Sequence, residues 1–473
     1  MTETATEKLN GTASEKLNEL ATGRIGRLLW RYSLPAVVGT LVMSLYNVID
    51  RIFIGQGVGP DAIAGLAITF PVMNLSSALG VLIGAGASAR TSILLGAGNH
   101  EGAERVLGNS LVLILVIASV YLTVFRVFLD DILIAFGASP RSLPYARDFM
   151  EWILPGMLVM NLSFSFNNIM RASGYPVRAM VTMFIGAGLN VAIAPIFIFA
   201  LDWGIKGAAI ATDIAMTVSM IFVMSHFCTS SSTLHFKRGI YRIKWPVVWG
   251  IVSIGAAPSI VNACACIINM LINKNLYHYG GDSAVAAAGI FTTYASLLTM
   301  IVVGICQGMQ PIIGYNYGAG LYHRLKRTYW LAVAAATVVC CAGAAFALLC
   351  PSLIARAFTV DSALIASTVK ALSISLTAFW FVGFQIVSTT FFQSLGKAGK
   401  SIFLSLVRQV IFLIPLLMML PPRWGLDGVW ASFPASDTMA TVLTAVMIAW
   451  QLRRLPLHPS SLPSPSAAVR QSE

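Results

Sequence analysis

Apolar runs of about 20 residues or more recur along this chain, and no other feature constrains its fold as strongly. A helix of that length crosses the hydrocarbon core of a bilayer, which is about 30 Å thick. Only 11% of the residues are charged and 57% are hydrophobic, so the chain cannot cover a water-exposed surface. Backbone groups in lipid must be hydrogen-bonded within their own segment, which favours helices. The sequence therefore predicts an all-α integral membrane protein.

About twelve transmembrane helices fit the apolar runs and leave no room for a separate water-soluble domain. The predicted spans are 28–54, 62–86, 107–128, 148–170, 177–200, 205–227, 247–273, 284–306, 328–350, 365–392, 401–420 and 428–451. Lysine and arginine gather in every second connection, on the side that holds the N-terminus. The positive-inside rule therefore places both termini in the cytoplasm.

The chain repeats itself at a nearly constant offset. Gly98 and Gly320 end similar Gly-Ala-Gly segments 222 residues apart, and Gly174 and Gly396 have the same separation. Trp203-Gly204 and Trp424-Gly425 recur at 221. Shared membrane composition alone would give scattered offsets. Two copies of a six-helix unit insert in the same orientation, so we expect a pseudo-two-fold axis along the membrane normal.

The repeat divides the chain into predicted parts. These are a cytoplasmic N-terminal segment (1–27), an N-lobe (28–227), a cytoplasmic linker (228–246), a C-lobe (247–453) and a disordered cytoplasmic tail (454–473). Paired lobes of this kind are typical of transporters, in which the halves rock around a central site.

A carboxylate inside a membrane segment is costly and points to function. Asp50 lies in the first predicted helix, and Asn47, Tyr46 and Met43 share its face at helical spacing. These side chains could line a polar cavity. The alternative is that Asp50 pairs with the neighbouring Arg51 or reaches the membrane surface.

Further polar residues fall in the fifth and sixth predicted helices. Asn190 precedes Pro195, which interrupts the helical hydrogen-bond ladder and frees carbonyl groups. Thr212 and Asp213 are adjacent in the sixth helix. Asn190 and Thr212 could equally be packing residues that bond to a neighbouring helix. Asn262, Asn269, Asn273, Gln385 and Gln393 give the second lobe a polar, uncharged lining, and the roles of Arg408 and Asp437 stay open.

Several classes of protein are disfavoured. The chain has no GxxxxGK[ST] loop for ATP and no HExxH metal motif, and it shows no clustered catalytic residues. Its net charge of +12 resides at helix ends rather than in one basic patch, so nucleic acid is not the expected partner. The seven cysteines fall mostly in apolar runs and are expected to be buried thiols. Neither an enzyme nor a protein with a cofactor or metal centre is predicted.

Several motifs resemble those of the multidrug and toxic compound extrusion (MATE) family. They are Leu34-Pro35, Tyr46-Asn47-Val48-Ile49-Asp50-Arg51, Met170-Arg171-Ala172-Ser173-Gly174, Gly204-Ile205-Lys206-Gly207 and the stretch from Gln307 to Gly320, which reads QGMQPIIGYNYGAG. The last is typical of the bacterial branch. The resemblance covers nearly the whole chain, from about Arg27 to Arg453.

This resemblance implies a secondary antiporter of the bacterial inner membrane. Its expected partners are cationic amphipathic drugs and the lipid bilayer. Such a protein exchanges its substrate for H⁺ or Na⁺ without ATP, and nothing requires more than a monomer. The family's ion site maps onto Asp50, Asn190 and Thr212, with Pro35 bending the first helix. The substrate cavity would include Met43, Tyr46, Asn47, Asn269, Asn273 and Gln307, and Na⁺ could bind at Asp50, Asn190 and Thr212.

One position departs from the family pattern, because Ala194 stands where an aspartate is usual. Three alternatives follow: Asp213 replaces the missing carboxylate, Asp50 alone binds the proton because desolvation disfavours its charged form, or the chain is a differently specialised relative. The second is preferred. The competing function is a lipid-linked oligosaccharide flippase of the same superfamily, which usually has more helices and a cavity rich in arginine. A channel would not need duplicated lobes.

Overall fold

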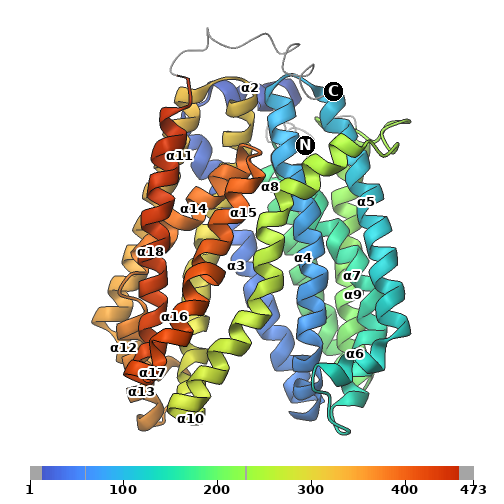
Figure 1. The fold of residues 1–473 in the computed structure, drawn as a ribbon. Coiled ribbons are helices and arrows are strands. Elements are labelled where there is room, and N and C mark those ends of the chain that lie inside the picture. The colour runs from blue at the N-terminus through green and yellow to red at the C-terminus, as the bar shows by residue number, and fades with distance from the viewer. Residues whose placement is uncertain (1–12, 59, 230–231, 457–473) are drawn as a thin grey trace, which may run out of the picture. The chain divides into compact units, whose positions relative to one another are not determined.

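The computed structural model describes residues 13–58, 60–229 and 232–456, and these form helices and connecting turns without a β-strand. The first half contains α2 (Ala13–Thr22), α3 (Ile25–Gly57), α4 (Pro60–Gly96), α5 (His100–Val127), α6 (Leu129–Ala135), α7 (Leu143–Ala172), α8 (Pro176–Pro195), the π-helix η1 (Ile196–Ala200) and α9 (Gly204–Cys228). The second half contains α10 (Trp245–Gly318), α11 (Tyr322–Leu349), α12 (Pro351–Phe358), α13 (Ser362–Ser375), α14 (Trp380–Ser394), α15 (Ala398–Leu406), the π-helix η2 (Val407–Leu413), α16 (Ile414–Met419), α17 (Pro421–Trp424) and α18 (Leu426–Arg453). Figure 1 labels these elements.

Ten helices of the described residues are long and apolar enough to cross a membrane, or eleven if the bent pair α13 and α14 forms one span. The 74-residue α10 is counted once in that number, although it would measure roughly 110 Å if it were straight. Its backbone leaves the helical conformation at Gly281, where φ is 63°. Each side of that break is long enough for a span, so the twelve predicted spans all correspond to helical segments. The prediction of an all-α membrane protein is confirmed.

The sequence repeat is also a repeat of backbone conformation. Gly98 and Gly320 have φ values of 74° and 71°, and Gly204 and Gly425 have values of 55° and 57°. The glycines at 174 and 396 are likewise in the positive-φ region, where a side chain would be strained. The short helices α6 and α12, which no hydrophobic run predicted, begin at residues 129 and 351. These two starts are again 222 residues apart, so the duplication includes the short helices.

The structure divides into two compact units, and each contains helical segments from outside the corresponding predicted lobe. The first unit comprises Val38–Asn262 together with the described residues up to Gly23. The second comprises Ala263 onward together with Arg24–Val37, which is the start of α3. The start of α10 therefore belongs to the first unit. The predicted linker and tail fall partly outside the described residues, at 230–231 and 457–473, and the first 12 residues of the predicted N-terminal segment lie outside them as well.

In the first unit α7 packs against both α4 and α9, and α8 packs against α9 (Figure 1). The contact between α4 and α7 is tight because glycines of α4 meet α7 directly. A Cβ atom on Gly84 would lie 2.9 Å from the Cα atom of Ser165, and one on Gly80 would lie 2.3 Å from Oδ1 of Asn161. The glycines of α4 therefore allow close packing of the two helices.

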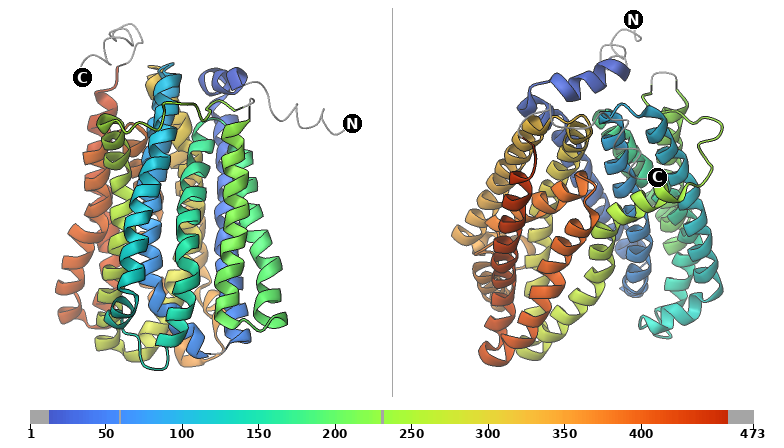
Figure 2. Two further views of the ribbon diagram at one scale, coloured as in Figure 1. Left: turned by 90° about the vertical axis from the view of Figure 1, so that its right-hand side faces the viewer. Right: turned by 45° about the horizontal axis from the view of Figure 1, so that its top comes forward.

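Helix α2 was not predicted, because the first 27 residues were expected to be only a polar segment. It is a separate short helix that precedes the first spanning helix, α3 (Figure 2). Leu20 is fully buried, and the ammonium group of Lys16 lies 3.7 Å from the centre of the Tyr175 ring. This cation–π contact and the buried leucine hold α2 against the first unit.

We expect Gly86→Ala to destabilise the protein and Gly188→Ala to leave it unchanged or slightly more stable. A Cβ atom at position 86 would lie 1.9 Å from the carbonyl oxygen of Ile251, whereas nothing lies within 4 Å of one at position 188. The first change forces two backbones apart, at a cost of roughly 1–3 kcal/mol. The second gains helix propensity of about 1 kcal/mol or less. Thermal unfolding in detergent measures both, and equal melting temperatures would contradict the close packing.

Candidate functional site

Tyr46 is the centre of a polar group within the first unit. The ring is buried, with 7% of the residue exposed, and packs against Ala187 of α8 and Met216 of α9. Its hydroxyl group hydrogen-bonds to the side chain of Thr212 and lies within electrostatic range of both Asp50 and Asp213. Tyr46 thus interacts with Asp50 of its own helix and with Thr212 and Asp213 of α9. The sequence had assigned this tyrosine only to the substrate cavity.

Asp50 presents an unsatisfied acceptor. Its Oδ1 atom is buried and has no hydrogen-bond partner among the described residues. The neighbouring Arg51 is near enough to act on the carboxylate electrostatically, but its guanidinium group lies over the ring of Phe70, at 5.5 Å. No ion pair between Asp50 and Arg51 is present in the described part of the chain. The geometry therefore favours a functional carboxylate over the alternative of a local pair with Arg51.

Asn190 and Thr212 bridge α8 and α9. The amide nitrogen of Asn190 donates to the hydroxyl oxygen of Thr212 at 2.9 Å, and Thr212 donates in turn to the carbonyl of Ala208 at 3.0 Å. Asn190 is 1% exposed, and its Oδ1 atom is buried without a partner in the described structure. The amide donor is therefore used for packing, while the amide oxygen stays available as an acceptor.

Asp213 fits beside α7 only because residue 156 is a glycine. A Cβ atom on Gly156 would lie 1.6 Å from Oδ1 of Asp213, so any side chain there would occupy the carboxylate's position. This Oδ1 atom is buried and lacks a side-chain hydrogen-bond donor within the described residues. The structure thus places a second carboxylate in the same electrostatic neighbourhood as Asp50, with Tyr46 acted on by both.

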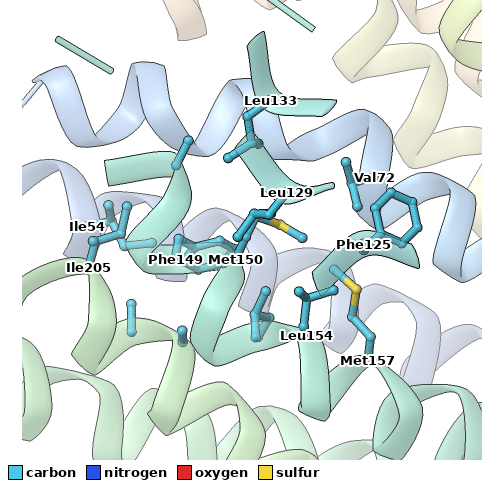
Figure 3. Packing of buried hydrophobic residues seen from close by; sticks show 14 of the residues in the cluster. Ile54, Val72, Phe125, Leu129, Leu133, Phe149, Met150, Leu154, Met157 and Ile205 are labelled. Atoms are coloured by element: carbon cyan, nitrogen blue, oxygen red, sulfur yellow. The ribbon is translucent and has the colours of Figure 1, made fainter. Parts of the chain in front are cut away.

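Apolar residues surround position 194, where the family usually has an aspartate. Ala194 is fully buried in a cluster that includes Ile54, Ile198 and Ile205. Figure 3 shows part of this cluster, with Phe149, Met150 and Leu154 of α7 at its centre. Directly after Pro195 the backbone changes from α8 to the π-helix η1. The proline does interrupt the helical ladder, but no carboxylate accompanies the interruption.

The remaining predicted residues of α3 have different environments. Met43 packs against the small cluster formed by Tyr46, Ala187 and Met216. Asn47 is exposed, and its amide nitrogen donates to the carbonyl of Met43 at 2.8 Å. Pro35 lies inside the continuous helix α3 and belongs to the second unit.

Three residues predicted for the substrate cavity lie on α10 in the second unit. Asn269 and Asn273 are exposed and one helical turn apart, and Gln307 is half-buried. They belong to a different unit from Tyr46 and Asp50. Their part in a substrate cavity stays a prediction.

A buried polar chain on α7 was missed by sequence reasoning. Asn161 donates to Ser76 of α4 at 3.1 Å, and Ser76 donates to the hydroxyl oxygen of Tyr121 on α5 at 3.3 Å. Ser163 and Ser219 contact each other at 3.1 Å between α7 and α9. The sequence feature that could have revealed these contacts is the run of serine and asparagine residues from 161 to 168, which is unusual inside an apolar helix.

The site offers acceptors, and no ion pair to Asp50 or Asp213 is present among the described residues. Three buried oxygens, one each from Asp50, Asn190 and Asp213, have no side-chain hydrogen-bond donor among the described residues. Buried acceptors without donors are costly, and a proton or a small cation relieves that cost. Oxygen atoms are also the ligands that hard cations such as Na⁺ prefer. No group of three or more His, Cys, Asp or Glu residues suited to a metal ion exists in the described part of the chain.

Comparison with known proteins identifies the family. The MatE family model matches residues 35–196 and 258–419, two segments that correspond to the two repeats. The chain is 26% identical over 439 residues to the multidrug export protein MepA of Staphylococcus aureus strain MRSA252, covering 92% of this chain and 96% of that protein. MepA of Staphylococcus haemolyticus is likewise 26% identical, with coverages of 93% and 96%.

Solved structures share the fold. The outward-facing structure of a multidrug resistance MATE family transporter superposes with a TM-score of 0.87 at 24% identity, over 92% of this chain and 98% of that one. The predicted resemblance is therefore confirmed, as is the prediction that the chain is not an enzyme. This multi-pass membrane protein belongs to the MatE family of transporters.

Proposed function

We propose that this transporter exports amphipathic organic cations in exchange for H⁺ or Na⁺ that moves inward. The relatives named as multidrug export proteins support the export of drug-like small molecules. The observation that carries the ion exchange is the group of three buried acceptor oxygens of Asp50, Asn190 and Asp213 in the first unit, none of which has a side-chain donor among the described residues. Acceptors without a donor are suited to a cation and unsuited to an anion.

In this proposal Asp50 and Asp213 act as a pair through Tyr46. Asp213 takes over the part of the carboxylate that Ala194 cannot supply, which favours the first of the three alternatives over the single-carboxylate alternative. Support comes from the electrostatic effect of both carboxylates on Tyr46 and from the close fit of Asp213 against Gly156. When one proton or Na⁺ binds, the net negative charge of the pair falls, and its affinity for a positively charged substrate falls with it. Ion and substrate thereby weaken each other's binding, a coupling that is reciprocal by thermodynamic necessity.

The membrane arrangement follows the predicted charge distribution. Both termini would be cytoplasmic and the protein would reside in the bacterial inner membrane, working as a monomer without ATP. The predicted lobes 28–227 and 247–453 would alternate access to the two sides of the membrane. Of the two ions, Na⁺ would use the oxygens of Asp50, Asn190 and Thr212.

Dye accumulation in bacterial cells that lack their own pumps tests this function. Cells expressing the protein should hold several-fold less of a fluorescent cationic dye than cells with an empty vector. An uncoupler should remove that difference if H⁺ is the coupling ion. If Na⁺ is the coupling ion, replacing external Na⁺ with K⁺ should remove it. Dye levels that are equal in both strains, or that ignore both gradients, would contradict the proposal.

We expect Tyr46→Phe to reduce gradient-driven export several-fold without unfolding the protein. The phenylalanine ring still fills the space against Ala187 and Met216, but the hydroxyl contact with Thr212 is lost. Tyr121→Phe is the matched control, because Tyr121 is also 7% exposed and its hydroxyl group contacts Ser76 instead. Transport by proteoliposomes measures both variants. Equal activity of the two would remove Tyr46 from the site.

A further inference from the structure

The second unit contains an intramembrane ion pair at a place set by the repeat. An offset of 222 carries Asn190 to position 412, and an offset of 221 carries Thr212 to position 433. Arg408 and Asp437 each lie one helical turn from those positions, on η2 and α18. In each unit, therefore, a polar pair joins equivalent helical segments of the repeat. These are α8 and α9 in the first unit and η2 and α18 in the second. The first unit uses an amide and a hydroxyl group, and the second uses a guanidinium group and a carboxylate.

The contact is made through the Nε edge of the guanidinium group, and two consecutive residues of α18 take part in it. Nε of Arg408 donates to Oδ1 of Asp437 at 2.7 Å. The hydroxyl group of Ser436 donates to the backbone carbonyl of Arg408 at 2.6 Å. A π-helix shifts backbone hydrogen bonding by one residue, and η2 begins directly before Arg408, so the serine satisfies a carbonyl at an irregular part of the helix.

The arginine is the more accessible partner. Its side chain is 29% exposed, against 7% for the side chain of Asp437. A guanidinium group has five N–H donors, and four of them are on the terminal nitrogens rather than on Nε. A molecule that approaches this pair therefore meets donors first, and a planar anionic oxygen group such as a carboxylate matches them.

Unsatisfied amides accompany the pair. Gln409, the next residue after Arg408, has a buried Oε1 atom without a partner among the described residues. Gln385 of α14 is 2% exposed, and neither atom of its amide has a hydrogen-bond partner in the described structure. Cys340 of α11 lies near both the pair and α14. Its thiol is within electrostatic range of Arg408 and Asp437. A Cβ atom on Gly383 of α14 would lie 3.1 Å from its Sγ atom. Buried amides without partners are expected where a polar ligand supplies the missing bonds.

We propose that Arg408 forms a binding subsite for the carboxylate of zwitterionic amphipathic substrates. This inference rests on the proposed function, because it assumes that amphipathic molecules enter the transporter. The two units then divide the recognition of charge. The carboxylates of the first unit favour cationic groups, and the guanidinium group of the second favours an anionic one.

The test compares rhodamine B, which carries a free carboxylate, with its cationic ethyl ester. Fluorescence anisotropy with the purified full-length protein in detergent gives the affinity for each dye. The variant Arg408→Gln/Asp437→Asn removes both charges and leaves no unpaired ion. We expect it to bind rhodamine B roughly tenfold more weakly and the ester within twofold of the original affinity. Lys370→Gln/Asp427→Asn is the control, because it removes a more exposed ion pair of the same unit.

Three outcomes would overturn the subsite. One is an equal loss of affinity for both dyes in the Arg408 variant, and another is no loss for either. In the third, the unaltered protein binds both dyes with equal affinity, and it binds phosphatidylglycerol whereas the variant does not. That result would assign the guanidinium group to a lipid phosphate. Export of the ester by cells tests the proposed function separately, so failure of the subsite and failure of the function are distinguishable.

Discussion

Asp50→Asn should abolish gradient-driven export, with a loss of at least a hundredfold in the initial rate. The substitution keeps the size of the side chain and removes the charge that a proton or Na⁺ would neutralise. Because Oδ1 of Asp50 is buried without a hydrogen-bond donor, no described neighbour could take over its interaction with the ion. Proteoliposomes loaded with substrate and subjected to an imposed pH or Na⁺ gradient measure the rate directly.

The control for Asp50 is Asp148→Asn. Asp148 is a carboxylate of the same unit that is 40% exposed and pairs with Lys206 at 3.3 Å, and its loss should leave export near the original level. Asp213→Asn should reduce export strongly as well if the two carboxylates act as a pair. Full, gradient-dependent transport by the Asp50 variant would exclude Asp50 as the ion carrier.

Arg408→Gln should be the most destabilising single charge removal in the second unit. It leaves the carboxylate of Asp437, with 7% of its side chain exposed, without the guanidinium group that neutralises it. Removing one partner of a buried ion pair costs about 3–5 kcal/mol. Asp437→Asn should cost less, because the arginine side chain is 29% exposed and can move its charge toward water.

The double variant Arg408→Gln/Asp437→Asn should recover most of the lost stability, since it buries no unpaired charge. Thermal unfolding of the three variants in detergent gives the comparison. The exposed pair Lys370–Asp427 serves as the reference, and its removal should cost about 1 kcal/mol or less. If the double variant were as unstable as Arg408→Gln, the destabilisation would not come from the unpaired carboxylate.

The fold could be predicted because lipid allows so few solutions. An apolar run of sufficient length has to be helical, so the spans followed from the sequence, and the offset between Gly98 and Gly320 predicted two copies of one unit. The same physics explains what was missed. Helices α2, α6, α12 and α17 do not need to cross the membrane, so no hydrophobic run of that length marks them.

The candidate site was only partly predictable, because a linear pattern shows which residues share a helix face but not which helices meet. Asp50, Asn190 and Thr212 were identified from their cost in lipid and from the family resemblance. The place of Asp213 depends on the absent side chain of Gly156, a residue of another helix. The contact between Tyr46 and Thr212 likewise depends on how α3 packs against α9. The pairing of Arg408 with Asp437 could not be seen for the same reason.

The central claim is that a coupling cation and the substrate oppose each other at Asp50. Counting the ions that the purified protein releases when it binds a cationic dye tests this claim most directly. In weakly buffered detergent solution, with Na⁺ absent or saturating, we expect release of about one H⁺ or one Na⁺ per dye bound, and none from Asp50→Asn. Dye binding without ion release by the unaltered protein, or equal release by the variant, would contradict it.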